Sequence, residues 1–225
     1  MEKRKTWAVI PAYNEEKNIS RITSKAKKYV DHVVVVDDGS RDKTRQLAEN
    51  AGAIVLRHII NLGKGAALKT GCDYAFKKGA EFVVALDADA QHSPNDIPRF
   101  IEKLEKYDIV FSYRKTSSKM PAVLRFGNWF ISNAAIALYG VKLKDTQCGF
   151  RAFSKKAYSK IRWNSADYSM ESEMISRTGK QKLKYVQIPI RTIYADRYKG
   201  TTVIDGVKIV LNMFWWKVLN GSNSR

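Results

Sequence analysis

Short apolar runs rich in β-branched residues alternate with amphipathic stretches through the first half of the chain. Ile19, Ile22, Ala26 and Tyr29 recur at spacings of three and four, which predicts a helix that buries one side. Regular alternation of strands and helices predicts parallel strand pairing, and therefore an open α/β sheet with helices on both faces. Five runs are predicted as strands, over residues 6–10, 32–36, 53–56, 82–86 and 109–112.

Capping residues predict where several helices begin. Asn14 is a predicted N-cap for the first helix, with Glu15 and Glu16 in its first turn. Another helix is predicted to open at residues 93–96, where a serine precedes a proline and then an aspartate. A third is predicted over residues 44–51. Because ligands of open α/β sheets bind beyond the carboxyl ends of the strands, chemistry is expected in the loops that follow them.

The pattern changes from about Pro121 onwards. A helix over residues 125–138 is predicted to precede a polar segment that reaches Gly149, followed by short mixed elements and a last helix. No linker separates the two parts, so residues 1–225 are predicted to form a single domain. Within it we distinguish a first half over about 1–115, a second half over about 116–200 and an amphipathic last helix over about 203–220.

Composition narrows the possible partners. Forty Lys and Arg residues against 22 Asp and Glu give a formal net charge of +18, which attracts nucleotides, nucleic acids and acidic lipid headgroups. The charge is the only support for a nucleic-acid-binding domain, because the sequence contains no helix-turn-helix, zinc knuckle or RNP-like aromatic motif. The two cysteines, Cys72 and Cys148, lie too far apart in sequence to form a metal-ligand pair. We therefore expect them to be reduced thiols in a cytoplasmic protein. No signal peptide and no apolar run of roughly 20 residues is found, so the chain is predicted to be soluble or peripheral to a membrane.

The loop after the fourth predicted strand holds the strongest candidate chemistry. Asp87 and Asp89 are separated by one residue, and two carboxylates so close together repel each other in a partly desolvated site. Helix-capping aspartates are the ordinary alternative for such a pair. A hard cation such as Mg²⁺ or Mn²⁺ would relieve the repulsion and favours carboxylate, water and phosphate oxygens. At the end of a buried strand, the pair predicts a metal held against a diphosphate.

Two further loops offer nucleotide contacts. After the second strand, Asp37 or Asp38 can cap the following turn, which leaves the other carboxylate to read a base or ribose; we expect this to be Asp38. Residues 61–65 are predicted to open a helix whose free backbone N–H groups, with Lys64, could meet a phosphate. The spacing is neither that of a P-loop nor that of a Rossmann fingerprint.

Five motifs in order resemble those of family 2 glycosyltransferases with the GT-A fold, a Rossmann-like open sheet. They are PAYNEE from Pro11, VVDDGS from Val35, NLGKGAALKTG from Asn61, LDADAQH from Leu86 and DTQCGFRAF from Asp145. The match spans residues 6 to about 203 and is most similar to dolichyl-phosphate mannose and dolichyl-phosphate glucose synthases. This resemblance implies an enzyme that moves a hexose-type sugar from a UDP- or GDP-linked donor to dolichyl or another polyprenyl phosphate.

The resemblance also implies roles for individual residues. Catalysis is expected from Asp89, Arg114 and Glu173. The metal, Mg²⁺ or Mn²⁺, is expected on Asp87, Asp89 and Gln91. Arg114, Arg125 and Arg151 are expected to meet the acceptor phosphate. The residues expected to bind the nucleotide sugar are Pro11, Tyr13, Glu15, Val36, Asp38, Lys64, Asp87, Ala88, Asp89, Gln91, Arg114 and Arg197.

The sequence departs from many mannose synthases after Arg197. Those enzymes read Gly-x-Ser-Lys where this chain has residues 200–203, Gly-Thr-Thr-Val, so the lysine expected on the diphosphate is missing. That argues against GDP-mannose, and the DTQCGF motif favours a UDP-sugar.

An acceptor phosphate would need no general base, whereas a sugar hydroxyl would need a carboxylate such as Glu171 or Glu173. Both could instead complement a helix N-terminus, or Glu173 could orient a cation.

The last helix carries the argument for a membrane. Ile204, Val207, Leu211 and Phe214 belong to one apolar stripe, which Trp215 and its neighbours widen almost around the helix. Such a helix could lie in the interface of an anionic membrane, or pack on the core or a partner subunit. With the charge of +18, we expect peripheral attachment to the cytoplasmic face.

Direct backside attack at the anomeric carbon would invert its configuration.

Overall fold

The computed structural model describes residues 4–114 and 132–191, which fold around one seven-stranded sheet with the strand order β3-β2-β1-β4-β6-β5-β7. Four strand pairs are parallel, and β6 runs antiparallel to both of its neighbours. The strands are β1 Thr6–Ala12, β2 His32–Asp38, β3 Ile54–His58, β4 Phe82–Ala85, β5 Ile109–Arg114, β6 Arg151–Ser154 and β7 Tyr185–Ile190. The helices are α1 Ile19–Ala26, α2 Thr44–Asn50, α3 Lys64–Lys77, the 3₁₀ turn η1 Pro94–Asp96, α4 Ile97–Leu104, α6 Lys155–Ile161 and α7 Ser169–Lys180. Residues 132–139 are also helical and overlap the helix predicted over residues 125–138.

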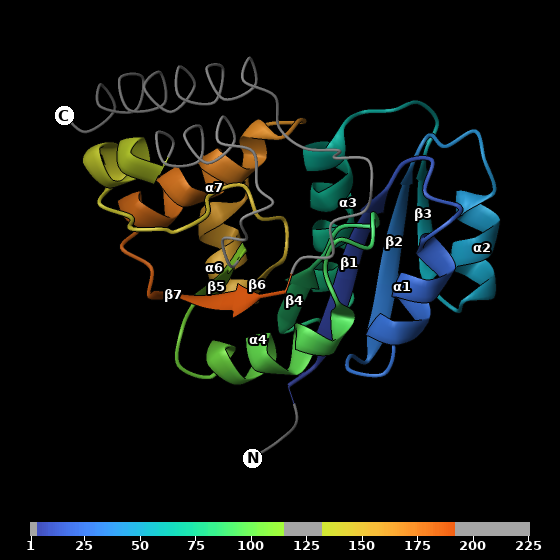
Figure 1. Ribbon diagram of the computed structural model, residues 1–225, viewed down its shortest axis with the longest axis horizontal. Coiled ribbons are helices and arrows are strands. Elements are labelled where there is room, and N and C mark those ends of the chain that lie inside the picture. The colour runs from blue at the N-terminus through green and yellow to red at the C-terminus, as the bar shows by residue number, and fades with distance from the viewer. Residues whose placement is uncertain (1–3, 115–131, 192–225) are drawn as a thin grey trace.

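Helices cover both faces of the sheet, as the alternation of elements predicts (Figure 1). On one face α3, α6 and α7 bury their apolar sides, and on the other α1, α2 and α4 do so. Strands β1, β2 and β4 are buried on both faces, which explains why runs such as residues 33–36 are continuously apolar instead of alternating. The mostly parallel α/β architecture predicted from the sequence is confirmed.

Strand β6 joins the two halves of the chain. It lies between β4 and β5, where Arg151 of β6 is opposite Ala85 on one side and opposite Phe111 on the other. The loop that follows β4 therefore lies beside the segment that precedes β6, although about 60 residues separate them. The sequence predicted only short mixed elements in the region of β6.

The start of the first helix differs from the prediction. Helix α1 begins at Ile19 after Asn18, and no acidic residue lies in its first turn. Asn14 has a φ of 53° and does not cap the helix; its Oδ1 accepts from the N–H of Arg41 at 3.0 Å. The loop after β1 is longer than expected because it packs against the loop after β2, where the Asn14 N–H donates to Ser40. The predicted cap at Ser93 is confirmed, since its hydroxyl accepts from the N–H of Asn95.

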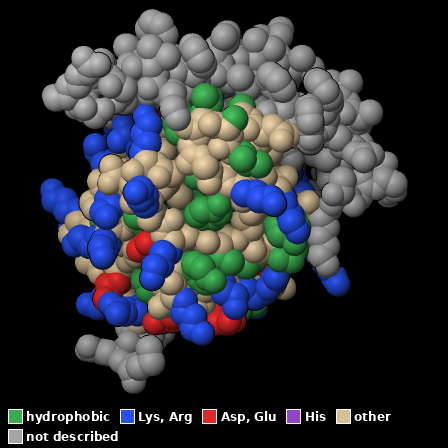
Figure 2. Space-filling model, turned by 90° about the vertical axis from the view of Figure 1, so that its left-hand side faces the viewer, with side chains coloured by type: hydrophobic (Ala, Val, Ile, Leu, Met, Phe, Trp, Pro, Cys, Tyr) green, Lys and Arg blue, Asp and Glu red, His purple; other side chains and the backbone are tan. Residues whose placement is uncertain are grey.

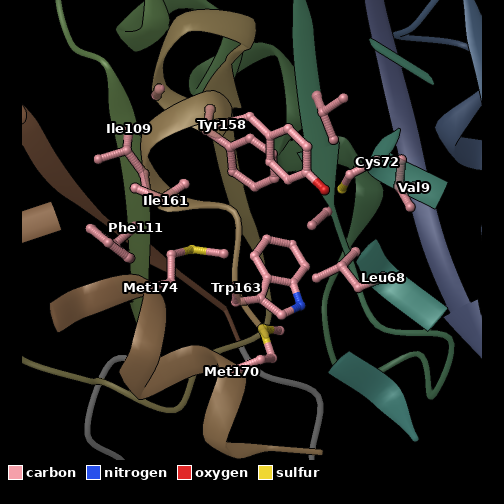
Figure 3. Packing of buried hydrophobic residues seen from close by; sticks show 14 of the residues in the cluster. Val9, Leu68, Cys72, Ile109, Phe111, Tyr158, Ile161, Trp163, Met170 and Met174 are labelled. Atoms are coloured by element: carbon pink, nitrogen blue, oxygen red, sulfur yellow. The ribbon is translucent and has the colours of Figure 1, made fainter. Parts of the chain in front are cut away.

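A buried tryptophan connects the second half to the start of α3. Trp163 is fully buried, and its indole lies between Met170 of α7 and Leu68 of α3 (Figure 3). Its Nε1 donates to the carbonyl oxygen of Gly65 at 2.9 Å. The first turn of α3 is thus held by the core of the other half.

Several sequence-based expectations concern other parts of the chain. The last helix over 203–220, together with Arg125 and Arg197, lies outside the described residues. Within residues 4–114 and 132–191, no helix is both long and apolar enough to cross a bilayer. Cys72 and Cys148 are buried and unbridged, as predicted.

Candidate functional site

The loops after β1, β2 and β4 meet at one cleft of about 470 Å³ at the carboxyl edge of the parallel strands. The second half supplies the opposite wall. Ten of the residues expected to bind the nucleotide sugar or metal line this cleft. They are Pro11, Tyr13, Glu15, Asp38, Lys64, Asp87, Ala88, Asp89, Gln91 and Arg114. Because the strands are parallel, their following loops converge here, as expected from the sheet alone.

An ion-paired lysine occupies the centre of the cleft. The Nζ of Lys64 lies 2.8 Å from Oδ1 of Asp87 and 3.2 Å from Oε1 of Glu171. Burial opposes the charge on Lys64, but the two carboxylates outweigh burial and raise the pKa of the ammonium. Burial likewise opposes ionisation of Asp87, and Lys64 outweighs it, so the pKa of that carboxyl is lowered. Both groups are therefore charged at neutral pH.

The pKa of Asp89, the second aspartate of the pair, is shifted in the opposite direction from that of Asp87. Burial, and then the charge of Asp87, raise the pKa of Asp89 above its ordinary value. The Oδ1 of Asp89 accepts from the N–H of Gln91 at 2.9 Å, which turns the loop back towards the cleft. A divalent cation would relieve the repulsion between the two carboxylates.

The cleft residues fit a metal that is shared with a ligand. Gly149 approaches Asp87 so closely that a Cβ there would overlap the carboxylate, so glycine makes room for Asp87. Among the residues that the structure describes, no group of three or more His, Cys, Asp and Glu side chains forms a metal cage. Mg²⁺ is typically bound by one or two carboxylates with water and substrate phosphates. Asp87, Asp89 and the amide of Gln91 match that kind of site.

Asp38 organises the loop that carries the start of α3. Its carboxylate accepts from the N–H groups of Leu62 and Gly63, at 2.9 and 2.8 Å, and lies 2.7 Å from Nδ1 of His58. Gly63 has a φ of 98°, a conformation that side-chain-bearing residues rarely adopt. Asp38 thus has protein partners as well as a place on the cleft. Asp37 caps the turn after β2, because its Oδ1 accepts from the N–H of Ser40 at 3.0 Å, as expected for one of the two aspartates. Contact of Asp38 with a base or ribose stays a prediction.

The helix terminus expected to meet phosphate is also partly occupied. The N–H of Gly63 is taken by Asp38, and that of Ala66 donates to the carbonyl oxygen of Ala166 at 3.0 Å. The lysine side chain, and not the row of backbone amides, is therefore the main cationic feature that α3 presents to the cleft.

Arg114 is fixed by a two-pronged ion pair. Its Nε lies 2.7 Å from Oδ2 of Asp145, and its Nη2 lies 3.2 Å from Oδ1. Asp145 is buried and also accepts from the N–H of Gln147 at 3.1 Å. Paired hydrogen bonds of this kind fix the plane of the guanidinium, so one face of the cleft carries an oriented cation.

Three expected residues are not at the cleft. Val36 is fully buried in the core of the sheet. Arg151 is also buried, and its guanidinium donates to the carbonyl oxygens of Cys148 and Thr146. Its side chain ties the loop before β6 to the sheet and lies 3.6 Å from the carboxylate of Glu171, which lines the cleft.

Glu173 is the third of these residues. Its carboxylate accepts from the N–H groups of Asn164 and Ser165 and pairs with Arg177 at 2.7 Å. The helical position that would bring a side chain to the cleft belongs to Glu171, two residues earlier. Residues two apart on a helix do not share a face, which sequence proximity alone does not reveal.

Apart from the small residues Ala12 and Ala67, four cleft residues were not singled out as site residues from the sequence. They are His92, Gln147, Asp167 and Tyr168. His92 and Gln147 sit inside two of the recognised motifs, so their position was the available signal. Asp167 and Tyr168 precede α7 in a stretch without a distinctive pattern, and only the fold brings them to the site.

Comparison with known proteins agrees with this geometry. The model of the family described as Glycosyl transferase family 2 matches residues 7–162. An uncharacterized protein of Methanocaldococcus jannaschii is 37% identical over 97% of this chain and 94% of its own length. The UDP-N-acetylglucosamine--dolichyl-phosphate N-acetylglucosaminyltransferase of Methanococcus voltae is 32% identical over 94% of this chain and 96% of its own.

Solved structures show the same fold. Glucosyl-3-phosphoglycerate synthase from Mycobacterium tuberculosis, in complex with Mn²⁺, UDP and phosphoglyceric acid, superposes with a TM-score of 0.73 at 20% identity. The match covers 95% of this chain and 78% of that chain.

Proposed function

Because the chain belongs to glycosyl transferase family 2, we propose that it transfers a sugar from a nucleotide diphosphate donor to a polyprenyl phosphate, with inversion. The observation on which the proposal rests is the placement of Asp87, Asp89 and Arg114 around one cleft. The cleft combines carboxylates that can hold a metal cation with a separate arginine of fixed orientation. Together they suit a reaction in which one anion attacks and another leaves.

Asp87, Asp89 and Gln91 would hold a Mg²⁺ or Mn²⁺ ion against the donor diphosphate. Such an ion stabilises the negative charge that develops on the leaving nucleoside diphosphate, an effect of several kcal/mol. Within the protein, Gly149 leaves space for Asp87, and the Gln91 N–H orients Asp89. Arg114, held by Asp145, supplies a fixed positive charge for donor or acceptor phosphate.

The state of the two candidate bases favours a phosphate acceptor over a hydroxyl. Glu171 is buried between Lys64 and Arg151, and Glu173 is hydrogen-bonded to Asn164 and Ser165. These hydrogen bonds lower the pKa of Glu173 and make it a weak base, and Glu171 is already paired with two cations. A polyprenyl phosphate is already anionic and needs cations but no proton acceptor. Contacts from Arg125 and Arg197 to the phosphates remain predictions.

The relative from Methanococcus voltae supports a UDP-linked donor, since its name specifies UDP-N-acetylglucosamine and dolichyl phosphate. We therefore place UDP-sugars ahead of GDP-mannose, in agreement with the departure at residues 200–203. UDP-N-acetylglucosamine is the first donor to test.

A lipid acceptor requires access to a membrane surface, and we propose peripheral attachment to an anionic leaflet on the cytoplasmic side. On the side where α7 and β7 lie, Lys and Arg side chains surround a group of hydrophobic ones, with few Asp or Glu in view (Figure 2). The net charge of +18 supports the same proposal. Insertion of the last helix remains a prediction.

The deciding experiment is a transfer assay on the full chain with Mn²⁺, radiolabelled UDP-sugars or GDP-mannose, and either dolichyl phosphate or a saccharide. We expect a lipid-linked sugar from a UDP-donor, and at least about a 100-fold loss of turnover in Asp89→Asn, corresponding to a barrier increase near 3 kcal/mol. Glu102→Gln, an exposed carboxylate on α4, is the matched control and should keep full activity. Transfer to the saccharide but not to the lipid would instead identify a hydroxyl-acceptor enzyme, and normal turnover of Asp89→Asn would refute the metal assignment.

A further inference from the structure

Lys64 pairs with Asp87, one of the two carboxylates expected to hold a divalent cation. Its ammonium bridges carboxylates from opposite walls of the cleft, Asp87 after β4 and Glu171 on α7. It also lies 5.4 Å from the centre of the Tyr168 ring. About 18% of the Lys64 side chain is exposed, so the ammonium is largely enclosed but can be reached from the cleft. One internal positive charge thereby neutralises part of an acidic site.

The backbone around Lys64 is fixed by hydrogen bonds, whereas its ammonium is held by two ion pairs and the Tyr168 ring. Asp38 accepts from the N–H of Gly63, and the Ala66 N–H donates to Ala166. Trp163 donates to the carbonyl oxygen of Gly65 from the core. A change of partners at the ammonium therefore requires a change of side-chain rotamers and no movement of α3.

We propose that Lys64 is an internal counter-ion that holds Asp87 in the donor-free protein and transfers to the donor diphosphate when nucleotide and metal bind. The inference rests on the proposed function, because it takes the diphosphate and the divalent ion as ligands of this cleft. It adds that Lys64 makes the two ligands bind cooperatively. A metal ion on its own must displace the ammonium from Asp87, whereas a diphosphate offers the ammonium new anionic partners.

The direction of this coupling follows from charge. Two cations on the same carboxylate repel each other, so a bound ammonium weakens the affinity of Asp87 and Asp89 for Mn²⁺. Once the ammonium moves to the diphosphate, the repulsion falls and both carboxylates face the metal. By linkage, nucleotide must strengthen Mn²⁺ binding by the same factor by which Mn²⁺ strengthens nucleotide binding. Part of this factor comes from direct contact between metal and phosphate, and the rest is what Lys64 contributes.

The test measures Mn²⁺ binding by electron paramagnetic resonance, with and without UDP, and no turnover is required. Lys64→Met removes the charge while keeping an unbranched side chain, and Lys64→Gln keeps a polar donor for the carboxylates. Lys77→Met removes an equal charge from the exposed last turn of the same helix and is the matched control. Lys64→Arg retains the charge. Thermal melting of each variant identifies any that fails to fold.

We expect Mn²⁺ alone to bind Lys64→Met and Lys64→Gln at least about fivefold more tightly than the wild type, the lower end of typical coupling between ligands. UDP should then strengthen Mn²⁺ binding by a smaller factor in these variants than in the wild type. Lys77→Met and Lys64→Arg should behave as the wild type. If folded Lys64→Met and Lys64→Gln bind Mn²⁺ alone no more tightly, the counter-ion inference is wrong. Failure of every protein, wild type included, to bind Mn²⁺ with UDP would refute the proposed function instead.

Discussion

Gly149 lies against the carboxylate of Asp87, with no space between them for even a methyl group. The contact joins the loop after β4 to the segment before β6, and so links the two walls of the cleft. A side chain at 149 must push Asp87 out of place.

Gly149→Ala is therefore expected to lower turnover at least about 100-fold, since a displacement near 1 Å in a catalytic group can cost that much. Transfer of sugar to polyprenyl phosphate and Mn²⁺ affinity in the presence of UDP should both fall. Gly79→Ala is the control: no atom lies within 4 Å of its Cβ position, and its φ of 94° strains any residue other than glycine. It should lose about 1 kcal/mol of stability at unchanged turnover. Equal activity of the two variants would contradict the prediction.

Arg114 and Asp145 are expected to act as one unit. Asp145→Asn keeps the size of the side chain but removes the charge that holds the guanidinium, and turnover should fall about tenfold. In a double-mutant cycle with Arg114→Ala, the double variant should be little worse than Arg114→Ala alone, because contacting residues are not additive. The second bidentate arginine pair, Arg162 with Asp73, lies on the surface, so Arg162→Ala should leave kcat/KM unchanged. Additive effects of Arg114 and Asp145 would show that they act separately.

Glu173 is expected to stabilise the fold without taking part in turnover. Burial works to raise the pKa of Glu173, but hydrogen bonds from Ser165, Asn164 and Arg177 outweigh it, so the pKa is lowered. A carboxyl whose pKa is lower in the folded state stabilises above its unfolded pKa, and this contribution disappears as pH falls through the folded value.

Glu173→Gln should consequently reduce the free energy of unfolding by about 1–3 kcal/mol at pH 7, and by less below pH 4. Urea unfolding across this pH range measures the difference. Turnover at a temperature where both proteins are folded should remain within about twofold. A loss of kcat comparable to that of Asp89→Asn would return Glu173 to the list of catalytic residues.

Asp38 is expected to affect the donor through the loop that it holds. Asp38→Asn replaces one carboxylate oxygen by an N–H donor that faces the N–H of either Leu62 or Gly63. We expect the KM for the nucleotide sugar to rise about tenfold, with a smaller change in kcat, because the start of α3 loses an anchor worth about 1–3 kcal/mol. Asp42→Asn, in the loop after β2 and absent from the cleft, is the comparison. An unchanged KM in Asp38→Asn would rule out this role.

The sequence was most informative where backbone geometry follows from local pattern. The five predicted strands begin within one residue of β1 to β5, and their loops meet as parallel pairing requires. Motif spacing placed Asp87, Asp89 and Gln91 correctly at the cleft because all three lie on one short loop. Local chemistry was enough in these cases.

Side-chain direction in the second half was harder to predict. Glu171 and Glu173 look equivalent in sequence, yet only Glu171 reaches the cleft, because helix α7 turns the other towards Asn164. Likewise Arg151 is drawn into the core by carbonyl groups of a loop whose path depends on tertiary packing. Such outcomes are set by contacts between residues distant in sequence, which no local pattern contains.

The insertion of β6 between β4 and β5 also limits how substrates can enter. In proteins built from two lobes, a hinge opens the cleft and closes it around the ligand. Here hydrogen bonds of the central sheet run continuously from the donor wall to the wall opposite, so separating them would break the ladder. Entry and exit of substrates must therefore depend on side chains and loops at the rim, over a floor that stays rigid throughout the catalytic cycle.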